Sequence, residues 1–228
     1  MCGRFVLMTP GRDLAERFGL EEALDLEPRY NIAPTQVVVI IRLNRDTLQR
    51  CSAQVKWGLI PFWAKDASIG NRLINARSES ASEKPAFRAA FKARRCLVPA
   101  DGFYEWKKQE GKQKQPYLVR SADGSPFAFA GLWDGWTGPD GDTLESCTIL
   151  TTDANDLTRP IHDRMPVILK PEYYDLWLDP AVKDPALLKP LLRPYPSEEM
   201  VTQPVSPKVN RATYDAPDCV EAVSANDD

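Results

Sequence analysis

The chain has 228 residues, of which 43% are hydrophobic and 27% charged, and its formal net charge is -3 at pH 7. This composition is typical of a soluble globular protein that buries a full core. No apolar run approaches the roughly 18 residues of a membrane span, and no secretory leader opens the chain. We therefore expect a cytoplasmic protein without a membrane partner.

The five cysteines, at positions 2, 51, 96, 147 and 219, are scattered along the chain and form no CxxC pair. This spacing argues against a structural zinc site, and the odd number argues against a secreted disulfide framework. We expect most of them to be core thiols, and we expect no metal and no cofactor.

Charge is distributed unevenly along the chain. Residues 1–120 carry a formal charge of +8, whereas residues 121–228 carry -11. The N-terminal half could therefore present a local cationic face that suits a polyanionic partner. A solvated charged surface is the alternative.

In chain order, residues 10–19 (PGRDLAERFG) predict a short helix that starts at a proline and stops at a glycine. A loop follows, in which Asn31 and Pro34 suit a rigid turn. The β-rich runs at 36–42 and 47–58 are joined by a short polar turn, and this pattern predicts a hairpin.

Aromatic residues gather in segment 57–63 (WGLIPFW), a loop broken by glycine and proline and followed by Lys65. Rings beside basic residues suit stacking on unpaired nucleic-acid bases, although core packing is the alternative for each ring. Residues 73–79 (LINARSE) predict a strand. Asn75 and Arg77 share one face of it, because side chains two residues apart point the same way.

Residues 82–95 predict a helix with Ser82 as its N-cap, and the arginines at 94–95 are interpreted as charges at its C-terminal end. A strand, a turn and a second strand follow over residues 96–107. They place Glu105 among aromatic residues, where the pKa of a carboxyl rises. A solvent-facing Glu105 paired with a neighbouring lysine is the alternative.

His162 is the only histidine in the chain. It lies in a loop-like stretch between two prolines and among charged residues, which favours a proton-transfer role, although a lone surface or core histidine is the alternative. The remaining elements are strands at 115–120, 126–133 and 145–152 and amphipathic helices at 171–178 and 185–193.

Short alternating strands with a few helices predict an α+β fold. We expect a single domain over residues 1–215, with an antiparallel, partly barrel-like β-sheet core flanked by a few helices. Residues 216–228 carry little core material, so we expect a disordered tail. We find no internal repeat, P-loop, GxGxxG or GxSxG motif.

The first five residues, MCGRF, carry a chemical possibility. If an aminopeptidase removes Met1, the chain begins at Cys2 with a free amine and a thiol on adjacent carbons. An aldehyde can condense with that amine to an imine, and the thiol can then close a five-membered thiazolidine. Ordinary pKa values of about 8 and about 8.5 leave both nucleophiles available near neutral pH. A buried structural Cys2 is the alternative.

Several motifs together resemble the SRAP (SOS-response-associated peptidase-like) family, over residues 1 to about 212. The resemblance depends on their order and spacing more than on any one of them. The motifs are MCGRF at the start, RYNIAPTQ at 29–36, LINARSE at 73–79, GFYEWKK at 102–108, IHDRMPVIL at 161–169 and, more weakly, VSPKVN at 205–210.

The resemblance implies a DNA-damage role, in which the N-terminal cysteine reacts with an abasic site in single-stranded DNA. Cys2 matches the covalent nucleophile, Asn75 and Glu105 match polar residues of the site, and His162 matches its histidine. From the chemistry of these groups, His162 would move a proton during opening of the sugar ring, and Glu105 would relay protons for imine formation and thiol closure. Asn75 would orient the sugar hydroxyl.

The resemblance also implies contacts to DNA. Arg4 and Arg77 match residues that hold backbone phosphates, so little sequence preference is expected. Phe62 and Trp63 match a base-stacking segment, although this chain has Phe-Trp where better-known members have Trp-Trp. The full set of expected DNA contacts is Gly3, Arg4, Asn31, Pro34, Phe62, Trp63, Arg77, Trp106 and Lys208.

Two other classes of function stay open at this stage. Glutamine amidotransferase domains also begin Met-Cys-Gly, which raises an N-terminal-nucleophile amidohydrolase, although no further glutamine-site motif is found. A non-covalent single-stranded DNA module is the other. The family name implies self-cleaving peptidase activity, so autoproteolytic loss of Met1 is an alternative to aminopeptidase trimming. We expect a monomer that is nucleoid-associated when it is bound to DNA.

Overall fold

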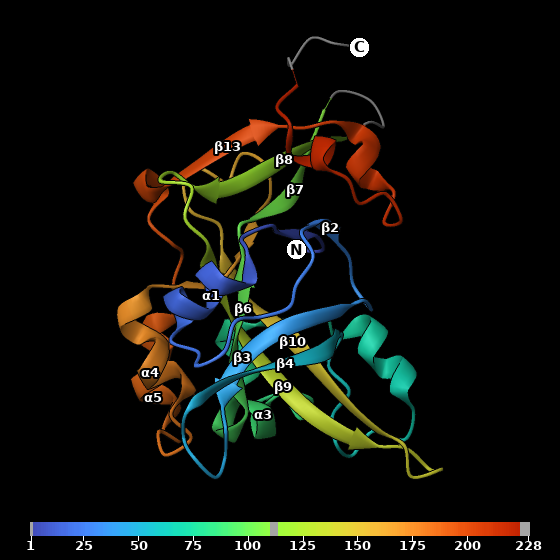
Figure 1. Ribbon diagram of the computed structural model, residues 1–228, viewed down its shortest axis with the longest axis vertical. Coiled ribbons are helices and arrows are strands. Elements are labelled where there is room, and N and C mark those ends of the chain that lie inside the picture. Colours follow the sequence, from blue (N-terminus) through green and yellow to red (C-terminus); the bar gives the residue numbers. More distant parts are fainter. Residues whose placement is uncertain (1, 110–113, 224–228) are drawn as a thin grey trace.

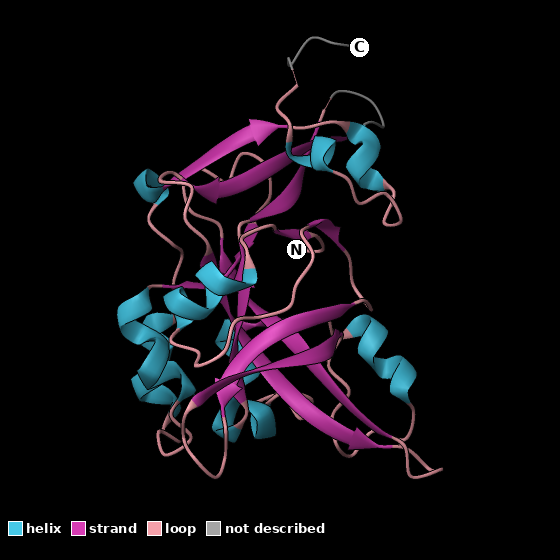
Figure 2. Ribbon diagram, viewed as in Figure 1, coloured by secondary structure: helices cyan, strands magenta, loops and turns pink. Residues whose placement is uncertain are grey.

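The computed structural model describes residues 2–109 and 114–223 (Figure 1). It has an α+β fold with two sheets, and the start of the chain lies between them (Figure 1). Figure 2 shows that the helices lie around the strands rather than between them. The predicted fold class is confirmed, including the barrel-like sheet.

The larger sheet closes on itself as a barrel. Its strands are β3 (Val37–Leu43), β4 (Arg50–Trp57), β6 (Arg95–Ala100), β9 (Phe127–Thr137) and β10 (Thr143–Asp153). Strand β10 pairs with both β4 and β9, which completes the ring β10-β4-β3-β6-β9. The predicted hairpin is confirmed by the antiparallel β3–β4 pair, whereas β10 and β4 run parallel.

Three short strands extend the barrel. β5 (Asn75–Arg77) pairs with β10 in parallel orientation, and β11 (Arg164–Pro166) pairs with β10 in antiparallel orientation. β12 (Ile168–Leu169) pairs with β9. The predicted strand at 73–79 is therefore shorter than expected.

The second sheet is antiparallel, in the order β13-β8-β7-β1-β2. Its strands are β1 (Phe5–Leu7), β2 (Arg29–Ile32), β7 (Gly102–Lys108), β8 (Lys114–Ser121) and β13 (Met200–Pro204). β7 follows β6 after a single residue, so one length of chain connects the barrel to this sheet. A Cβ at Gly102 would lie 2.9 Å from the Val119 carbonyl oxygen, so glycine permits the approach of β8 at this junction.

The core joins the two sheets through aromatic rings. The Phe5 ring in β1 contacts the rings of Trp57 and Phe129, at centroid distances of 5.2 and 5.8 Å. All three rings are buried. Edge-to-face contacts of this kind stabilise by about 1 kcal/mol each beyond the burial of apolar area. They fix β1, and with it the start of the chain, against the barrel.

The helices are short. They are α1 (Gly11–Phe18), α2 (Ser78–Ala81), α3 (Arg88–Ala93), α4 (Tyr174–Leu178) and α5 (Pro185–Leu188), and the 3-10 helices are η1 (Ala67–Arg72), η2 (Pro171–Tyr173), η3 (Lys189–Leu191), η4 (Ser197–Glu199), η5 (Pro207–Asn210) and η6 (Pro217–Val220). α1 confirms the helix predicted at 10–19. The helices predicted at 171–178 and 185–193 form as η2 with α4 and as α5 with η3.

The prediction of one helix over residues 82–95 is wrong. Ser82 is the C-cap of α2 rather than an N-cap, and α3 begins only at Arg88, after a turn. Phe87 in the turn and Ala90 and Phe91 in α3 are all buried. Packing against the barrel thus accounts for a pattern that also fits one continuous helix.

Arg95 does act as a charge at the end of α3, as interpreted from the sequence, although it is the first residue of β6. It is only 3% exposed. Its guanidinium donates to the carbonyls of Phe91 and Lys92 at the end of α3, and to those of Trp177 and Asp179 at the end of α4. Burial lowers its pKa to about 10. Arg95 therefore joins two helix C-termini, whose carbonyls favour a cation.

The C-terminal segment is ordered further than we expected. Residues 217–220 form η6, Cys219 is buried, and Val205 bridges Ala222. The disorder predicted from 216 is thus wrong for 216–223, and the rest of that prediction lies outside the described residues. Four of the five cysteines are buried and Cys51 is half-buried, as expected of core thiols.

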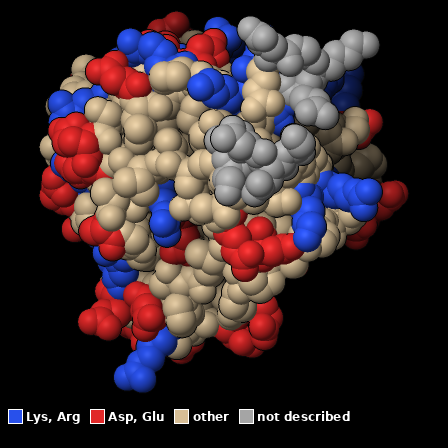
Figure 3. All heavy atoms as spheres, turned by 90° about the horizontal axis from the view of Figure 1, so that it is seen from above, with Lys and Arg blue, Asp and Glu red and all other residues tan. Residues whose placement is uncertain are grey.

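The charge asymmetry of the sequence does not give the face shown in Figure 3 a single sign. In the barrel, strands of the first half (β4, β3 and β6) close the ring with strands of the second half (β9 and β10). Basic and acidic side chains also lie next to one another on the face shown in Figure 3, with uncharged surface between them. Within the described ranges, no helix has the length and apolar character needed to cross a membrane.

We predict that Arg95→Met destabilises the fold by about 3 kcal/mol, because methionine keeps the bulk of the side chain but leaves four carbonyls without their donor. The melting temperature should fall by roughly 10 °C. Arg88→Met on the exposed side of α3 is the matched control and should leave it nearly unchanged. Equal melting temperatures for the two variants would contradict the structural role of Arg95.

Candidate active site around Cys2

Cys2 lies just before β1 and is fully buried. The side-chain amide of Asn75 donates a hydrogen bond to the Cys2 carbonyl at 2.7 Å. Asn75 is the first residue of β5, and parallel pairing with Ile149 of β10 fixes its backbone. The barrel therefore holds Asn75 against the start of the chain.

The other end of the Asn75 amide has an open hydrogen-bond site. Its Oδ1 is buried and accepts no hydrogen bond from the described part of the chain. An unsatisfied buried acceptor costs about 1–3 kcal/mol, so its presence next to Cys2 calls for an explanation. A hydroxyl donor on a bound substrate would satisfy it.

Glu105 lies on β7, next to the start of β1. Phe5 pairs with Phe103 in antiparallel register, and continuing this register places Glu105 opposite Gly3. The side chain is only 2% exposed, so the solvent-facing alternative does not hold. Burial raises the pKa of Glu105 to about 7, and the Asp163 carboxylate contributes to the rise. A carboxyl with this pKa can both accept and donate a proton near neutral pH.

The Cys2 thiol is held in its protonated form. Burial raises its pKa, and the nearby Glu105 carboxylate raises it further. The thiolate is the nucleophilic form of cysteine. A reaction at this sulfur therefore needs a base close by, and Glu105 is near enough to affect the thiol electrostatically.

His162 lies in the turn between β10 and β11, with about a third of its side chain exposed. Asn155 builds this turn, since its Oδ1 accepts hydrogen bonds from the backbone N–H and the hydroxyl of Thr158. Burial lowers the pKa of His162 and raises that of Glu105; the Asp163 carboxylate opposes the first shift and adds to the second. His162 and the Glu105 carboxyl on β7 thus have the Asp163 carboxylate as a common electrostatic neighbour.

Two neighbours compete for the Nδ1 atom of His162. The Arg164 backbone N–H donates to it at 3.0 Å, and Asp163 Oδ1 lies 2.9 Å away. In the neutral ring Nδ1 accepts from Arg164, so the proton is on Nε2; in the protonated ring Nδ1 can donate to Asp163. Burial lowers the pKa of His162, and the imidazolium is consequently a stronger acid.

Arg4 and Arg77 each lie two residues beyond a member of this cluster, Cys2 and Asn75. Arg77 ends β5, two residues beyond Asn75, and is exposed, while the intervening Ala76 is buried. Arg4 directly precedes β1 and is half-buried. Within the described residues neither arginine is ion-paired with a carboxylate, and Gly3 between Cys2 and Arg4 is partly exposed.

Phe62 and Trp63 are exposed, at 57% and 48%, in contrast to the buried Trp57 of the same segment. Their loop is nevertheless anchored. The Phe62 N–H donates to the buried Asp134 carboxylate, and the Arg94 guanidinium lies 5.8 Å from the Phe62 ring. Two adjacent rings held at a surface are suited to stacking on bases.

The other expected DNA contacts differ in accessibility. Pro34 is partly exposed, two residues beyond the Ile32 partner of Phe5. Trp106 is half-buried and donates from its indole to Asn210 Oδ1 at 2.7 Å. Lys208 is exposed but ion-paired with Asp218 at 2.8 Å.

Asn31 differs most from its expected role. It is fully buried, and its side-chain amide is bonded to Arg4 and to three carbonyls of the C-terminal segment. A direct DNA contact by this side chain does not fit its burial. The sequence interpretation also overlooked Asp163, although it directly follows the only histidine in the chain.

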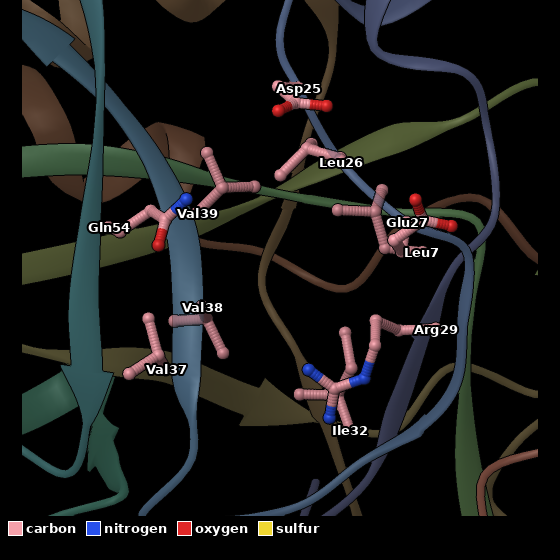
Figure 4. A pocket seen from close by; sticks show the side chains of 10 residues that line it. All are labelled: Leu7, Asp25, Leu26, Glu27, Arg29, Ile32, Val37, Val38, Val39 and Gln54. Atoms are coloured by element: carbon pink, nitrogen blue, oxygen red, sulfur yellow. The ribbon is translucent and has the colours of Figure 1, made fainter.

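A separate cavity of about 240 Å³ lies away from this cluster (Figure 4). Aliphatic side chains of β3 line it together with the polar residues of segment 25–29, and it includes no cysteine or histidine. Among the described residues, no three His, Cys, Asp or Glu side chains gather as a metal site.

The fold and this cluster define a single-domain α+β protein with a buried cysteine at its start, beside an ionisable carboxyl and a histidine turn. The family model described as "SOS response associated peptidase (SRAP)" matches residues 1–212, and the chain belongs to this family. The resemblance inferred from the motifs is thereby confirmed.

Relatives of known name agree with this assignment. The chain is 44% identical to "Abasic site processing protein YoqW" of Bacillus subtilis (strain 168), covering 97% of this chain and 100% of that protein. It is 35% identical to "Abasic site processing protein HMCES" of Xenopus tropicalis, covering 86% and 67%. A crystal structure of a protein from Bacteroides thetaiotaomicron superposes with a TM-score of 0.87 at 29% identity, covering 98% and 100%.

The raised pKa of Glu105 predicts a pH dependence of stability. The carboxyl is neutral in both folded and unfolded protein below about pH 4.5, and above about pH 7 its burial in the charged form costs on the order of 3 kcal/mol. The wild type should therefore lose that much stability relative to Glu105→Gln as the pH rises from 4.5 through 7.

Chemical denaturation at a series of pH values measures this difference. Glu83→Gln, at an exposed glutamate, is the matched control and should follow the wild-type curve. If the wild type and Glu105→Gln run parallel from pH 4.5 to 8, the Glu105 carboxyl is not buried as described.

Proposed function

We propose that this protein processes abasic sites in single-stranded DNA by forming a covalent bond to them through Cys2. The observation that carries the proposal is the contact of Asn75 with the Cys2 carbonyl beside a carboxyl whose pKa is about 7. The names of the relatives, which are abasic site processing proteins, support the choice of substrate.

The reaction follows from the groups present. Loss of Met1, by an aminopeptidase or by autoproteolysis, frees the Cys2 amine. An abasic deoxyribose is mostly a closed hemiacetal. Protonated His162 donates a proton to the ring oxygen as the C1′–O4′ bond breaks, and the anomeric hydroxyl loses its proton to water as the aldehyde forms. The Asn75 Oδ1 atom, which has no hydrogen-bond donor among the described residues, accepts a hydrogen bond from the freed sugar hydroxyl.

Two bond-forming steps complete the product. The amine adds to C1′, and loss of water gives an imine. Glu105 then takes the proton from the Cys2 thiol, and the sulfur adds to the same carbon while the imine nitrogen gains a proton. The resulting thiazolidine shields C1′ from β-elimination and strand cleavage. Because Glu105 is about half ionised near pH 7, it can serve both as acid and as base.

Positioning of the DNA is assigned to side chains around the cluster. Arg4 and Arg77 hold backbone phosphates, and the exposed rings of Phe62 and Trp63 stack on bases near the lesion. Such contacts do not read base edges, so the protein should accept most sequences. The protein acts as a monomer, associated with the nucleoid when bound.

Intact mass after incubation with an abasic oligonucleotide tests the covalent step. We expect a species with the summed mass less one water, and we expect none with Cys2→Ala or with a tetrahydrofuran analogue that has no aldehyde. Cys51→Ala, at a half-buried cysteine outside this cluster, is the matched control and should react like the wild type. A Cys2→Ala adduct would refute the proposal.

The same samples separate the competing readings. Treatment with borohydride reduces an imine but leaves a thiazolidine unchanged. A gain in the mass of the adduct would therefore show that the reaction ends at the imine, one step earlier than proposed. Binding without any adduct, and equal for abasic and intact DNA, would favour a non-covalent DNA module. Release of ammonia from glutamine would favour the amidohydrolase.

His162→Ala should slow adduct formation by about 10² to 10⁴, the usual contribution of a general acid, and leave DNA affinity within about twofold. Single-turnover gels with the oligonucleotide in excess give the rate, and fluorescence anisotropy gives the affinity. The wild-type rate should fall as the pH rises past the His162 pKa, which lies below its ordinary value. A large loss of affinity would instead assign His162 a structural role.

A further inference from the structure

The contacts around Arg4 suggest how this side chain is held. Its Nη1 atom donates to the Val209 carbonyl at 2.7 Å and to Asn31 Oδ1 at 3.1 Å, and its Nη2 atom lies 3.5 Å from the Asn210 carbonyl. All three acceptors are uncharged. The guanidinium is therefore fixed in direction, while no described carboxylate neutralises its charge.

Asn31 connects this arrangement to the C-terminal segment. Its amide nitrogen lies 3.1, 3.0 and 2.7 Å from the carbonyl oxygens of Val209, Arg211 and Tyr214. Its Oδ1 faces Arg4, so the orientation of the amide is determined on both sides. The side chain is fully buried, and it has no surface left for a ligand.

Two further contacts hold the segment in place. Asp215 Oδ1 accepts the backbone N–H groups of Tyr30 and Asn31, and its other oxygen is ion-paired with Arg29 at 2.6 Å. At the opposite end, the Trp106 indole donates to Asn210 Oδ1. Residues 209–215 are thus fastened to β2 and β7, the strands that flank β1.

We propose that Asn31 is a positioning residue for Arg4, and that the carbonyls of residues 209–214 complete a cradle that aims the guanidinium at a phosphodiester. The proposal rests on the proposed function only in taking DNA as the ligand. It makes the C-terminal segment, which begins 205 residues beyond Arg4 in sequence, part of the DNA site. A planar fork held by neutral acceptors keeps its remaining donors and its full charge for the phosphate.

A double-mutant cycle tests the proposal. In the Cys2→Ala background, affinity for single-stranded DNA that carries the tetrahydrofuran analogue is measured over a range of salt concentrations. Arg4→Ala should weaken binding by roughly ten- to a hundredfold and lower the salt slope by about 0.7, the value for one phosphate on a single strand. Asn31→Ala should produce a similar loss and the same change in slope. Added to Arg4→Ala, it should have no further effect.

Asn210→Ala supplies a variant that keeps the fold, because this side chain is exposed and only its contact with Trp106 is lost. It should weaken binding by a few fold, again only when Arg4 is present. Lys189→Ala, an exposed lysine on η3, controls for the loss of one positive charge and should leave the affinity within twofold.

An unchanged salt slope in Asn31→Ala, or losses that add to those of Arg4→Ala, would overturn the proposal, because a purely structural residue lowers the melting temperature without acting through Arg4. The non-reactive DNA and the Cys2→Ala background exclude covalent chemistry. The outcome of the double-mutant cycle therefore does not depend on whether crosslinking occurs. A negative outcome of the cycle likewise does not contradict the crosslinking proposal.

Discussion

The position of β1 between β7 and β2 is the constraint on which the site depends. The strand has only three residues, but it pairs on both sides and packs Phe5 against two rings of the barrel. The first residues of a chain fray unless such contacts hold them. Because β1 is fixed, Cys2 is buried where Asn75 on the barrel and Glu105 on the second sheet can both reach it. Each sheet alone would supply only half of the cluster.

Burial also sets the protonation behaviour of the cluster. The same loss of water raises the pKa of Glu105 to about 7 and lowers that of His162 below its ordinary value. The Glu105 carboxyl can therefore hold a proton near neutral pH, whereas the His162 imidazolium gives its proton up more readily. The Asp163 carboxylate adds to the rise for Glu105 and opposes the fall for His162, so this exposed side chain is an electrostatic neighbour of both groups.

Much of the site could be predicted from sequence, because short motifs carry it. Cys2, Asn75, Glu105 and His162 each lie in a motif, and the alternating pattern of the β3–β4 hairpin is local. The failures are non-local. Whether residues 82–95 form one helix depends on packing against the barrel, and nothing near Arg95 in sequence shows that two helix ends will converge on it. Asn31 was interpreted as a turn residue, because the carbonyls that accept hydrogen bonds from its amide lie some 180 residues away and no local pattern indicates them.

The arginines of the molecule show how a protein with an acidic pI can hold a polyanion. Several guanidiniums are neutralised by carboxylates, namely those of Arg29, Arg42, Arg50, Arg94 and Arg164. Arg4 and Arg77 lie beside the Cys2 cluster and have no such partner among the described residues. Net charge acts at long range and is screened within about 10 Å at 0.1 M salt. A phosphate close to Cys2 therefore responds to these two unneutralised groups, and the -11 carried by the C-terminal half has little influence there. That half contributes neutral carbonyls to the cradle of Arg4, so it holds this guanidinium without neutralising its charge.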